Sequence, residues 1–153
     1  LRIESKEAKQ LMSDYFARFG GVKTYLDQVV QKAKTLGYTT TVYGRRRPFP
    51  DLNSKIFQLR ENARRAALNA PIQGTAADIM KLAMISVDKK MKAEGLASKL
   101  LLQVHDELVF AVAPGELERL TELATESMRD VAELSVPLEV QIGIGRSWDE
   151  AAH

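Results

Sequence analysis

Two adjacent carboxylates, Asp106 and Glu107, are the side chains best suited to chemistry, because they interrupt two apolar stretches. The stretches, residues 99–105 and 108–112, are predicted strands of a hairpin that carries the acids at its tip. Mg²⁺ prefers oxygen ligands and usually takes one or two protein carboxylates, with water and phosphate oxygens completing its coordination. His105 is a candidate third ligand, although a histidine beside a turn is more often a hydrogen-bond donor. An ordinary polar turn accounts for the acids equally well, because Asp is a common turn residue.

Two further groups of polar side chains suit nucleic acid. Arg65, Asn69 and Gln73 are spaced by four residues and would project from one side of a continuous helix. Their guanidinium and amide groups match base-pair edges and sugar–phosphate oxygens. The arginine run at residues 45–47 follows a predicted turn at Gly44 and suits phosphate contacts. A solvated helix face and a plain basic surface are the alternatives, and residue types and spacing do not exclude them.

The net charge of +2 conceals an uneven distribution along the chain. Residues 1–65 hold 14 Lys and Arg against 6 Asp and Glu, a balance of +8, whereas residues 66–153 hold 8 against 14, a balance of −6. A basic half suits a polyanion and an acidic half suits cations, although two ordinary solvated surfaces would also carry these charges.

Composition restricts the class of protein. With 45% apolar and 27% charged residues in 153, the chain can bury a core and is not a disordered tail. The absence of cysteine excludes disulfides and thiolate metal sites. The longest apolar run, residues 108–113, is far short of the roughly 20 residues that span a membrane. We see no signal peptide, and because the chain does not begin with Met we expect a processed chain or a fragment.

Hydrophobic periodicity predicts an α+β fold in which a helical hairpin and further helices precede a small antiparallel sheet. Ser5 is the expected N-cap of the first helix, Gly20 and Gly21 the break in the hairpin, and Pro71 the end of the third helix. The second half should read helix–β–β–helix–β. The expected helices cover residues 5–19, 22–36, 54–69, 75–94 and 117–134, and the expected strands 38–43, 99–105, 108–112 and 137–142.

Two long motifs carry a resemblance to a known family. Residues 69–78, followed about thirty residues later by residues 103–107, resemble the family A DNA polymerases of the bacterial DNA polymerase I type. Residues 44–51 are similar to that family's hairpin, and residues 145–149 to its extreme C-terminus. The resemblance covers essentially the whole chain, in order and at the family's spacing.

The resemblance implies DNA-directed DNA synthesis by two-metal phosphoryl transfer, with Mg²⁺ as the expected ion and Mn²⁺ as one that the same oxygens would take. It implies that Asp106 ligates the metals, that Glu107 supports it, and that His105 lies near the primer 3′ end. Arg47 corresponds to a position near the template backbone. The minor-groove contacts to the template–primer would come from Arg65, Asn69 and Gln73. The expected partners are template–primer DNA and deoxynucleoside triphosphates, in the cytoplasm at the nucleoid and not at a membrane.

The departures from the family pattern matter as much. The segment with the other metal-binding aspartate and the nucleotide-binding helix have no counterpart in the sequence. We therefore expect residues 1–70 to be distal fingers helices with a β-hairpin and residues 71–153 the C-terminal part of the palm. The isolated chain should not extend primers, and its open sheet edge should favour self-association. The alternatives are a non-catalytic DNA-binding module derived from such a polymerase and a different divalent-metal enzyme.

Overall fold

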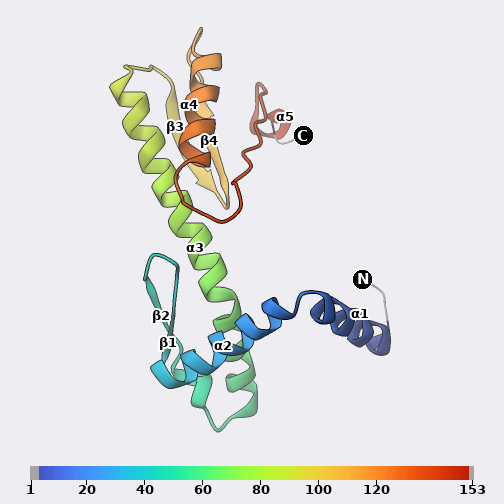
Figure 1. Ribbon diagram of the computed structural model, residues 1–153. Helices are drawn as coiled ribbons and strands as arrows, with labels where there is room; N and C mark the ends of the chain where they lie inside the picture. Colours follow the sequence, from blue (N-terminus) through green and yellow to red (C-terminus); the bar gives the residue numbers. More distant parts are fainter. Residues whose placement is uncertain (1–3, 152–153) are drawn as a thin grey trace. The chain divides into compact units, whose positions relative to one another are not determined.

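The computed structural model describes residues 4–151, which form two compact units with their boundary between Thr75 and Ala76 (Figure 1). The fold is α+β, as predicted: helices dominate and two small antiparallel sheets have two strands each. None of the helices in this described range combines the length and apolar character that a membrane crossing requires. The elements are α1 Ser5–Arg18, α2 Gly20–Leu36, β1 Tyr38–Thr40, β2 Arg46–Pro48, the 3₁₀ helix η1 Pro50–Asn53, α3 Phe57–Ala93, β3 Lys99–Val104, β4 Glu107–Ala111, α4 Leu117–Arg129 and α5 Trp148–Ala151.

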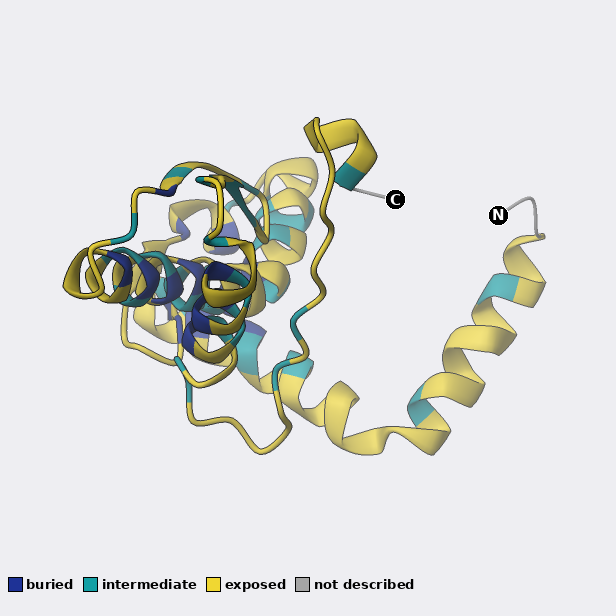
Figure 2. Cartoon of the chain, turned by 90° about the horizontal axis from the view of Figure 1, so that it is seen from above, coloured by how far each residue is buried: buried dark blue, intermediate teal, exposed yellow. Residues whose placement is uncertain are grey.

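The helical hairpin forms as expected, with small differences at its ends. Only Phe19 separates α1 from α2, so Gly20 begins the second helix instead of lying in a linker. Ser5 is the first helical residue and not the N-cap, which is Glu4, without a side-chain cap. Gly37 ends α2 in the left-handed conformation (φ 80°), where a glycine carries no steric penalty. Helix α1 buries no residue, and in Figure 2 it carries only the exposed and intermediate colours.

A short β-hairpin and its core follow. The sequence predicted one strand over residues 38–43, but β1 ends at Thr40 and pairs antiparallel with β2, which contains two of the three arginines of the run. Pro48 is tolerated because it ends an edge strand, where no ladder donor is needed. A hydrophobic core joins α2, Phe49, η1 and α3, and consists of Ala33, Phe49, Leu52, Ala67 and Ala70.

Helix α3 runs without interruption through Pro71, so the predicted break there is wrong. Proline removes one helical donor and disfavours the α region for the residue before it. Here Pro71 is itself buried, and the two alanines that precede it, Ala67 and Ala70, pack into the core. The Thr75 hydroxyl donates to the Pro71 carbonyl at 2.6 Å. Packing of this segment therefore outweighs the local cost of the proline.

The C-terminal unit packs α4 and the last turns of α3 against the β3–β4 hairpin. One cluster of buried apolar residues in this unit consists of Val87, Met91, Leu120 and Leu123. Helix α4 ends at Arg129, five residues earlier than predicted. The predicted strand at residues 137–142 is absent from the described chain. A strand exists only by pairing, and the sheet here contains β3 and β4 alone.

Candidate active site and nucleic-acid interface

The β3–β4 turn presents the two carboxylates of the sequence motif. Val104 pairs with Glu107, so the loop consists of His105 and Asp106, one residue earlier than predicted. His105 has a left-handed backbone (φ 52°), which is uncommon for a residue with a Cβ. The Gln103 side-chain amide donates to the His105 carbonyl at 2.7 Å and supports the turn. The turn therefore places Asp106 at the tip and Glu107 at the first position of β4.

Both carboxylates have oxygens available to a ligand. Asp106 and Glu107 are exposed, and within residues 4–151 neither side chain has a hydrogen-bond or ion-pair partner. Two adjacent carboxylates free of competing cations fit a hard divalent cation such as Mg²⁺. No group of three or more His, Asp or Glu side chains in the described range converges on one point. The turn thus offers two carboxylates, and the described range contains no complete metal-ligand set around them.

The polar row of α3 lies on one continuous helix, because the helix persists through Pro71. Arg65, Asn69 and Gln73 are all exposed, and two helical turns separate the first from the last, about 12 Å along the axis. Arg65 also donates to the Asn62 side-chain oxygen at 2.5 Å. The helix therefore presents a guanidinium and two amides in a row that a duplex could contact.

The two arginines of β2 are each braced by an aromatic ring. The Arg46 guanidinium lies 4.7 Å from the centre of the Tyr38 ring, and the Arg47 guanidinium 5.3 Å from that of Phe49. Successive strand residues point to opposite faces of a ribbon, so the two charges face opposite ways. Because Phe49 belongs to the core, Arg47 has the more firmly fixed support.

Contacts between the β1–β2 hairpin and α3 were not foreseen from the sequence. Arg45 Nη2 donates to the Gly74 carbonyl at 2.9 Å, and the Val42 amide donates to Thr75 Oγ1 at 3.1 Å. These residues are 29 and 33 positions apart, so no local pattern joins them. The sequence contains one local indication of the Thr75 contacts. A threonine four residues after Pro71 can donate its hydroxyl to the proline carbonyl when the helix continues.

Other acids of the C-terminal unit are engaged in structure. The Glu116 carboxylate accepts bonds from the Ser98 hydroxyl at 2.6 Å and from the amides of Ala97 and Ser98 at 2.8 and 2.9 Å. These bonds, the hydroxyl's first, hold the pKa of Glu116 below its usual range. Glu116 thereby attaches the residue before α4 to the start of β3.

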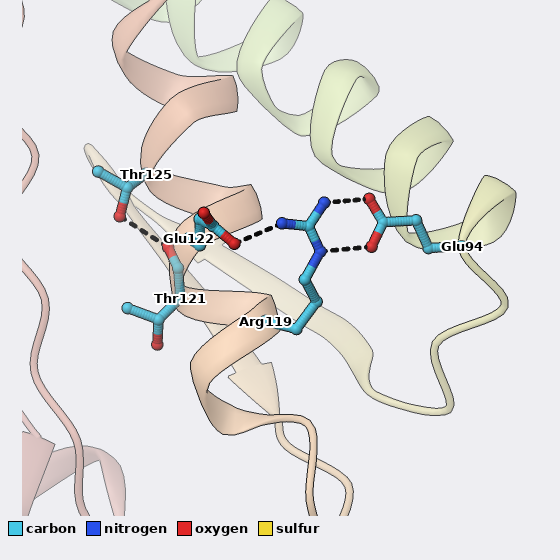
Figure 3. A network of polar contacts seen from close by, with 5 residues as sticks. All are labelled: Glu94, Arg119, Thr121, Glu122 and Thr125. Atoms are coloured by element: carbon cyan, nitrogen blue, oxygen red, sulfur yellow. Dashed lines mark hydrogen bonds and ion pairs between the residues drawn. The ribbon is translucent and has the colours of Figure 1, made fainter.

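An arginine joins the end of α3 to α4. Arg119 donates two bonds of 2.6 Å to Glu94 and also pairs with Glu122 (Figure 3). The bonds from Arg119 lower the pKa of Glu94, and the bonds to Glu94 and Glu122 raise the pKa of Arg119. The network was not predicted from the sequence, because the charged residues of α4 match the pattern of an ordinary solvent-exposed helix face.

Comparison with known proteins assigns the chain to a class. The sequence model of DNA polymerase family A matches residues 1–150. The DNA polymerase I of Mycobacterium bovis is 59% identical over all 153 residues, and that of Streptococcus pneumoniae is 48% identical over 151 residues, or 99% of the chain. The chain spans only 17% of the length of these relatives.

A solved structure resembles the fold throughout. The POL domain of Pol1 from M. smegmatis, in complex with DNA primer–template and dNTP, superposes with a TM-score of 0.95 at 58% identity. The match covers 99% of this chain and 27% of that one. The chain belongs to DNA polymerase family A, which confirms the resemblance carried by its two long motifs.

Proposed function

We propose that this chain contributes the distal fingers helices (residues 1–70) and the C-terminal palm (residues 71–153) to a DNA-directed DNA polymerase. The longer enzyme would add deoxynucleotides to a primer 3′ end under the direction of a template, in the cytoplasm at the nucleoid. The observation that carries the proposal is the match across 99% of the chain to a polymerase domain solved with primer–template and dNTP.

In this proposal the basic N-terminal unit contacts DNA through exposed groups on two elements. Arg47 of β2 lies near the template backbone, and Arg65, Asn69 and Gln73 of α3 contact the minor groove near the growing end. Minor-groove acceptors are shared among the base pairs, so contacts to them are largely independent of sequence. Such tolerance is what a polymerase requires, since every base pair passes the same residues.

The β3–β4 turn contributes ligands for the catalytic ions. Asp106 would ligate the metal and Glu107 would support it, while His105 would lie near the primer terminus. When bound, the two Mg²⁺ ions, or Mn²⁺ in their place, would lower the pKa of the primer 3′-hydroxyl and stabilise charge at the α-phosphate. The role of the protein at this turn is to hold carboxylate oxygens without a competing cation, as the exposed and unpartnered pair does within residues 4–151.

We propose that the isolated chain is inactive, because one carboxylate pair cannot hold two ions in the required arrangement. The test is primer extension by the purified 153-residue chain, freed of contaminating polymerase, with Mg²⁺ and all four deoxynucleoside triphosphates. No extension is expected. Robust magnesium-dependent extension would show that this part of the proposal is wrong.

A second candidate is a non-catalytic DNA-binding module that kept the minor-groove residues. The lack of a third metal-ligating side chain near Asp106 within the described range favours it. The reading frame upstream of Leu1 separates the two. A frame that continues into an Asp-Tyr-Ser-like segment and a Lys-bearing helix supports the polymerase, whereas a start codon immediately before Leu1 supports the module.

We further propose that the isolated chain self-associates through its sheet. Strands β3 and β4 pair only with each other within the described chain, and Leu101 and Leu102 of β3 are 56% and 46% exposed. Unpaired edges with apolar side chains invite pairing with another chain. Analytical ultracentrifugation at high concentration should show oligomers, and a clean monomer would contradict the proposal.

A further inference from the structure

The tip of the β1–β2 hairpin is fastened to α3 at three adjacent points, here called the tip joint. The Val42 amide donates to Thr75 Oγ1, and Arg45 Nη2 donates to the Gly74 carbonyl. At the third point the backbone approaches so closely that a Cβ on Gly74 would stand 2.7 Å from Cγ2 of Thr41. A Cβ there would force Thr41 to shift, so position 74 accommodates the hairpin without displacement when it is glycine.

The hydroxyl of Thr75 connects two structures at once. It donates to the carbonyl of Pro71 and accepts from the amide of Val42, so its one proton and one of its lone pairs are both in use. The tip itself is closed by bonds around Thr41, whose hydroxyl accepts from the Arg45 amide at 3.1 Å. The joint therefore attaches an already closed turn to a rigid helix.

The hairpin needs such an attachment. Its strands have three residues each, and a two-stranded ribbon of that size is marginal by itself in water. The other end of the ribbon is held by Phe49, which is 6% exposed in the core and donates its amide to Gly37 at 2.8 Å. Arg47 lies between these two anchors, so its position depends on both.

We propose that Gly74 and Thr75 are positioning residues for DNA binding: through the tip joint they hold β2 so that Arg47 meets a backbone phosphate. This inference rests on the proposed function, because it presumes that Arg47 contacts DNA. Neither residue needs to touch the nucleic acid. The joint restricts the motion of the hairpin before DNA binds. Without the joint, that motion would be lost on binding, and the lost conformational entropy would weaken the affinity.

The test compares Thr75→Val, which keeps the branched shape and loses the hydroxyl, with Thr75→Ser, which keeps the hydroxyl. Amide hydrogen exchange of the purified chain should be about tenfold faster at Val42 in Thr75→Val and near wild type in Thr75→Ser. Anisotropy with a fluorescein-labelled primer–template duplex should show affinity about three- to tenfold weaker for Thr75→Val only. The slope of log affinity against log salt should fall by about one, as for Arg47→Ala, although no charge was removed.

A steric pair provides an independent version of the test. Gly74→Ala should weaken duplex binding although alanine favours the helix, because its Cβ displaces Thr41. Adding Thr41→Ser removes the clashing methyl group, keeps the hydroxyl that accepts from Arg45, and should restore binding. Thermal unfolding of each variant identifies any that fail to fold, in which case the other pair decides.

The outcomes separate the two proposals. If the wild-type chain shows no salt-dependent duplex binding, the proposed DNA role fails and this inference fails with it. If wild type binds, and Thr75→Val exchanges faster at Val42 but keeps wild-type affinity and salt slope, the inference alone is overturned. Failure of Thr41→Ser to rescue Gly74→Ala would likewise count against the joint.

Discussion

The two β-hairpins of the chain are built alike and anchored differently. The β1–β2 hairpin carries cations, its tip is bonded to α3, and its arginines lie over aromatic rings. The β3–β4 hairpin carries two acids at its tip, and within residues 4–151 their side chains bond to nothing. Its bonds to other elements gather at the opposite end, around Glu116.

This difference fits the ligands proposed for the two hairpins. A cationic side chain that is already fixed in the folded protein binds a polyanion more tightly, because less conformational entropy is lost on binding. Acids that must accept a metal gain from having no internal cation, which would compete for their oxygens. Glu94 is paired within the chain and Asp106 is not, so of these two acids only Asp106 has its oxygens free of an internal cation.

The largest effect should come from the tip of the second hairpin. Asp106→Ala in the longer polymerase should lower the rate of primer extension about a thousandfold or more, because a ligand of the catalytic ions is lost. Glu107→Gln is the control and should lower the rate less, since the role proposed for Glu107 is a supporting one. Rates are measured by single-turnover extension at saturating DNA. Unchanged extension by Asp106→Ala would defeat the metal role.

A smaller effect should distinguish the two arginines of the first hairpin. Arg47→Ala should weaken duplex binding about tenfold at low salt and lower the salt slope by about one. Arg46→Ala removes the same charge from the opposite face of the ribbon. Its decrease in the logarithm of the affinity should be less than half that of Arg47→Ala. Anisotropy titrations across salt measure both variants. Equal losses would show that net charge matters and that the placement of Arg47 does not.

A third prediction concerns the polar row of α3. Gln73→Ala should weaken binding about fivefold, and equally for duplexes ending in A·T or G·C pairs, because minor-groove acceptors are shared. Gln28→Ala is the control, since it removes an exposed amide on α2, outside the row. A loss confined to one base pair would mean that Gln73 reads sequence.

The smallest effect concerns the base of the second hairpin. The pKa of Glu116 is lowered in the fold, so its bonds stabilise the chain above the ordinary glutamate pKa, and this stability is lost as pH falls through the lowered pKa. Glu116→Gln should lower the thermal midpoint by about 2 °C at neutral pH and by less in acid. Glu118→Gln separates loss of charge from loss of these bonds. A pH-independent difference would contradict the assignment.

Much of the fold followed from local pattern. Apolar spacing located the helical hairpin and α4, and the acid pair between two apolar runs located the β3–β4 hairpin to within a residue of its turn. The candidate site residues came from residue type and the family motifs, and the structure adds that Arg65, Asn69 and Gln73 share one unbroken helix.

What the sequence could not supply depends on distant partners. Helix α3 continues through Pro71 where Ala67 and Ala70 belong to a core that also contains Phe49, and a local rule about proline does not include that packing. Residues 137–142 have strand-forming composition but no third strand to pair with in the described chain. The tip joint links Val42 to Thr75 across 33 positions, and nothing in either residue type predicts this contact.

The left-handed backbone of His105 limits which residues the β3–β4 turn can accept over evolutionary time. Any residue that replaces His105 must first adopt this left-handed backbone conformation, whatever the chemistry of its side chain. Glycine and asparagine enter that region readily, whereas valine and isoleucine are excluded by their branched Cβ. In a saturation library selected only for a folded chain, position 105 should therefore retain glycine and asparagine and lose valine and isoleucine. The same library placed in the longer polymerase and selected for primer extension should be narrowed further, toward histidine, if His105 has its proposed place near the primer terminus.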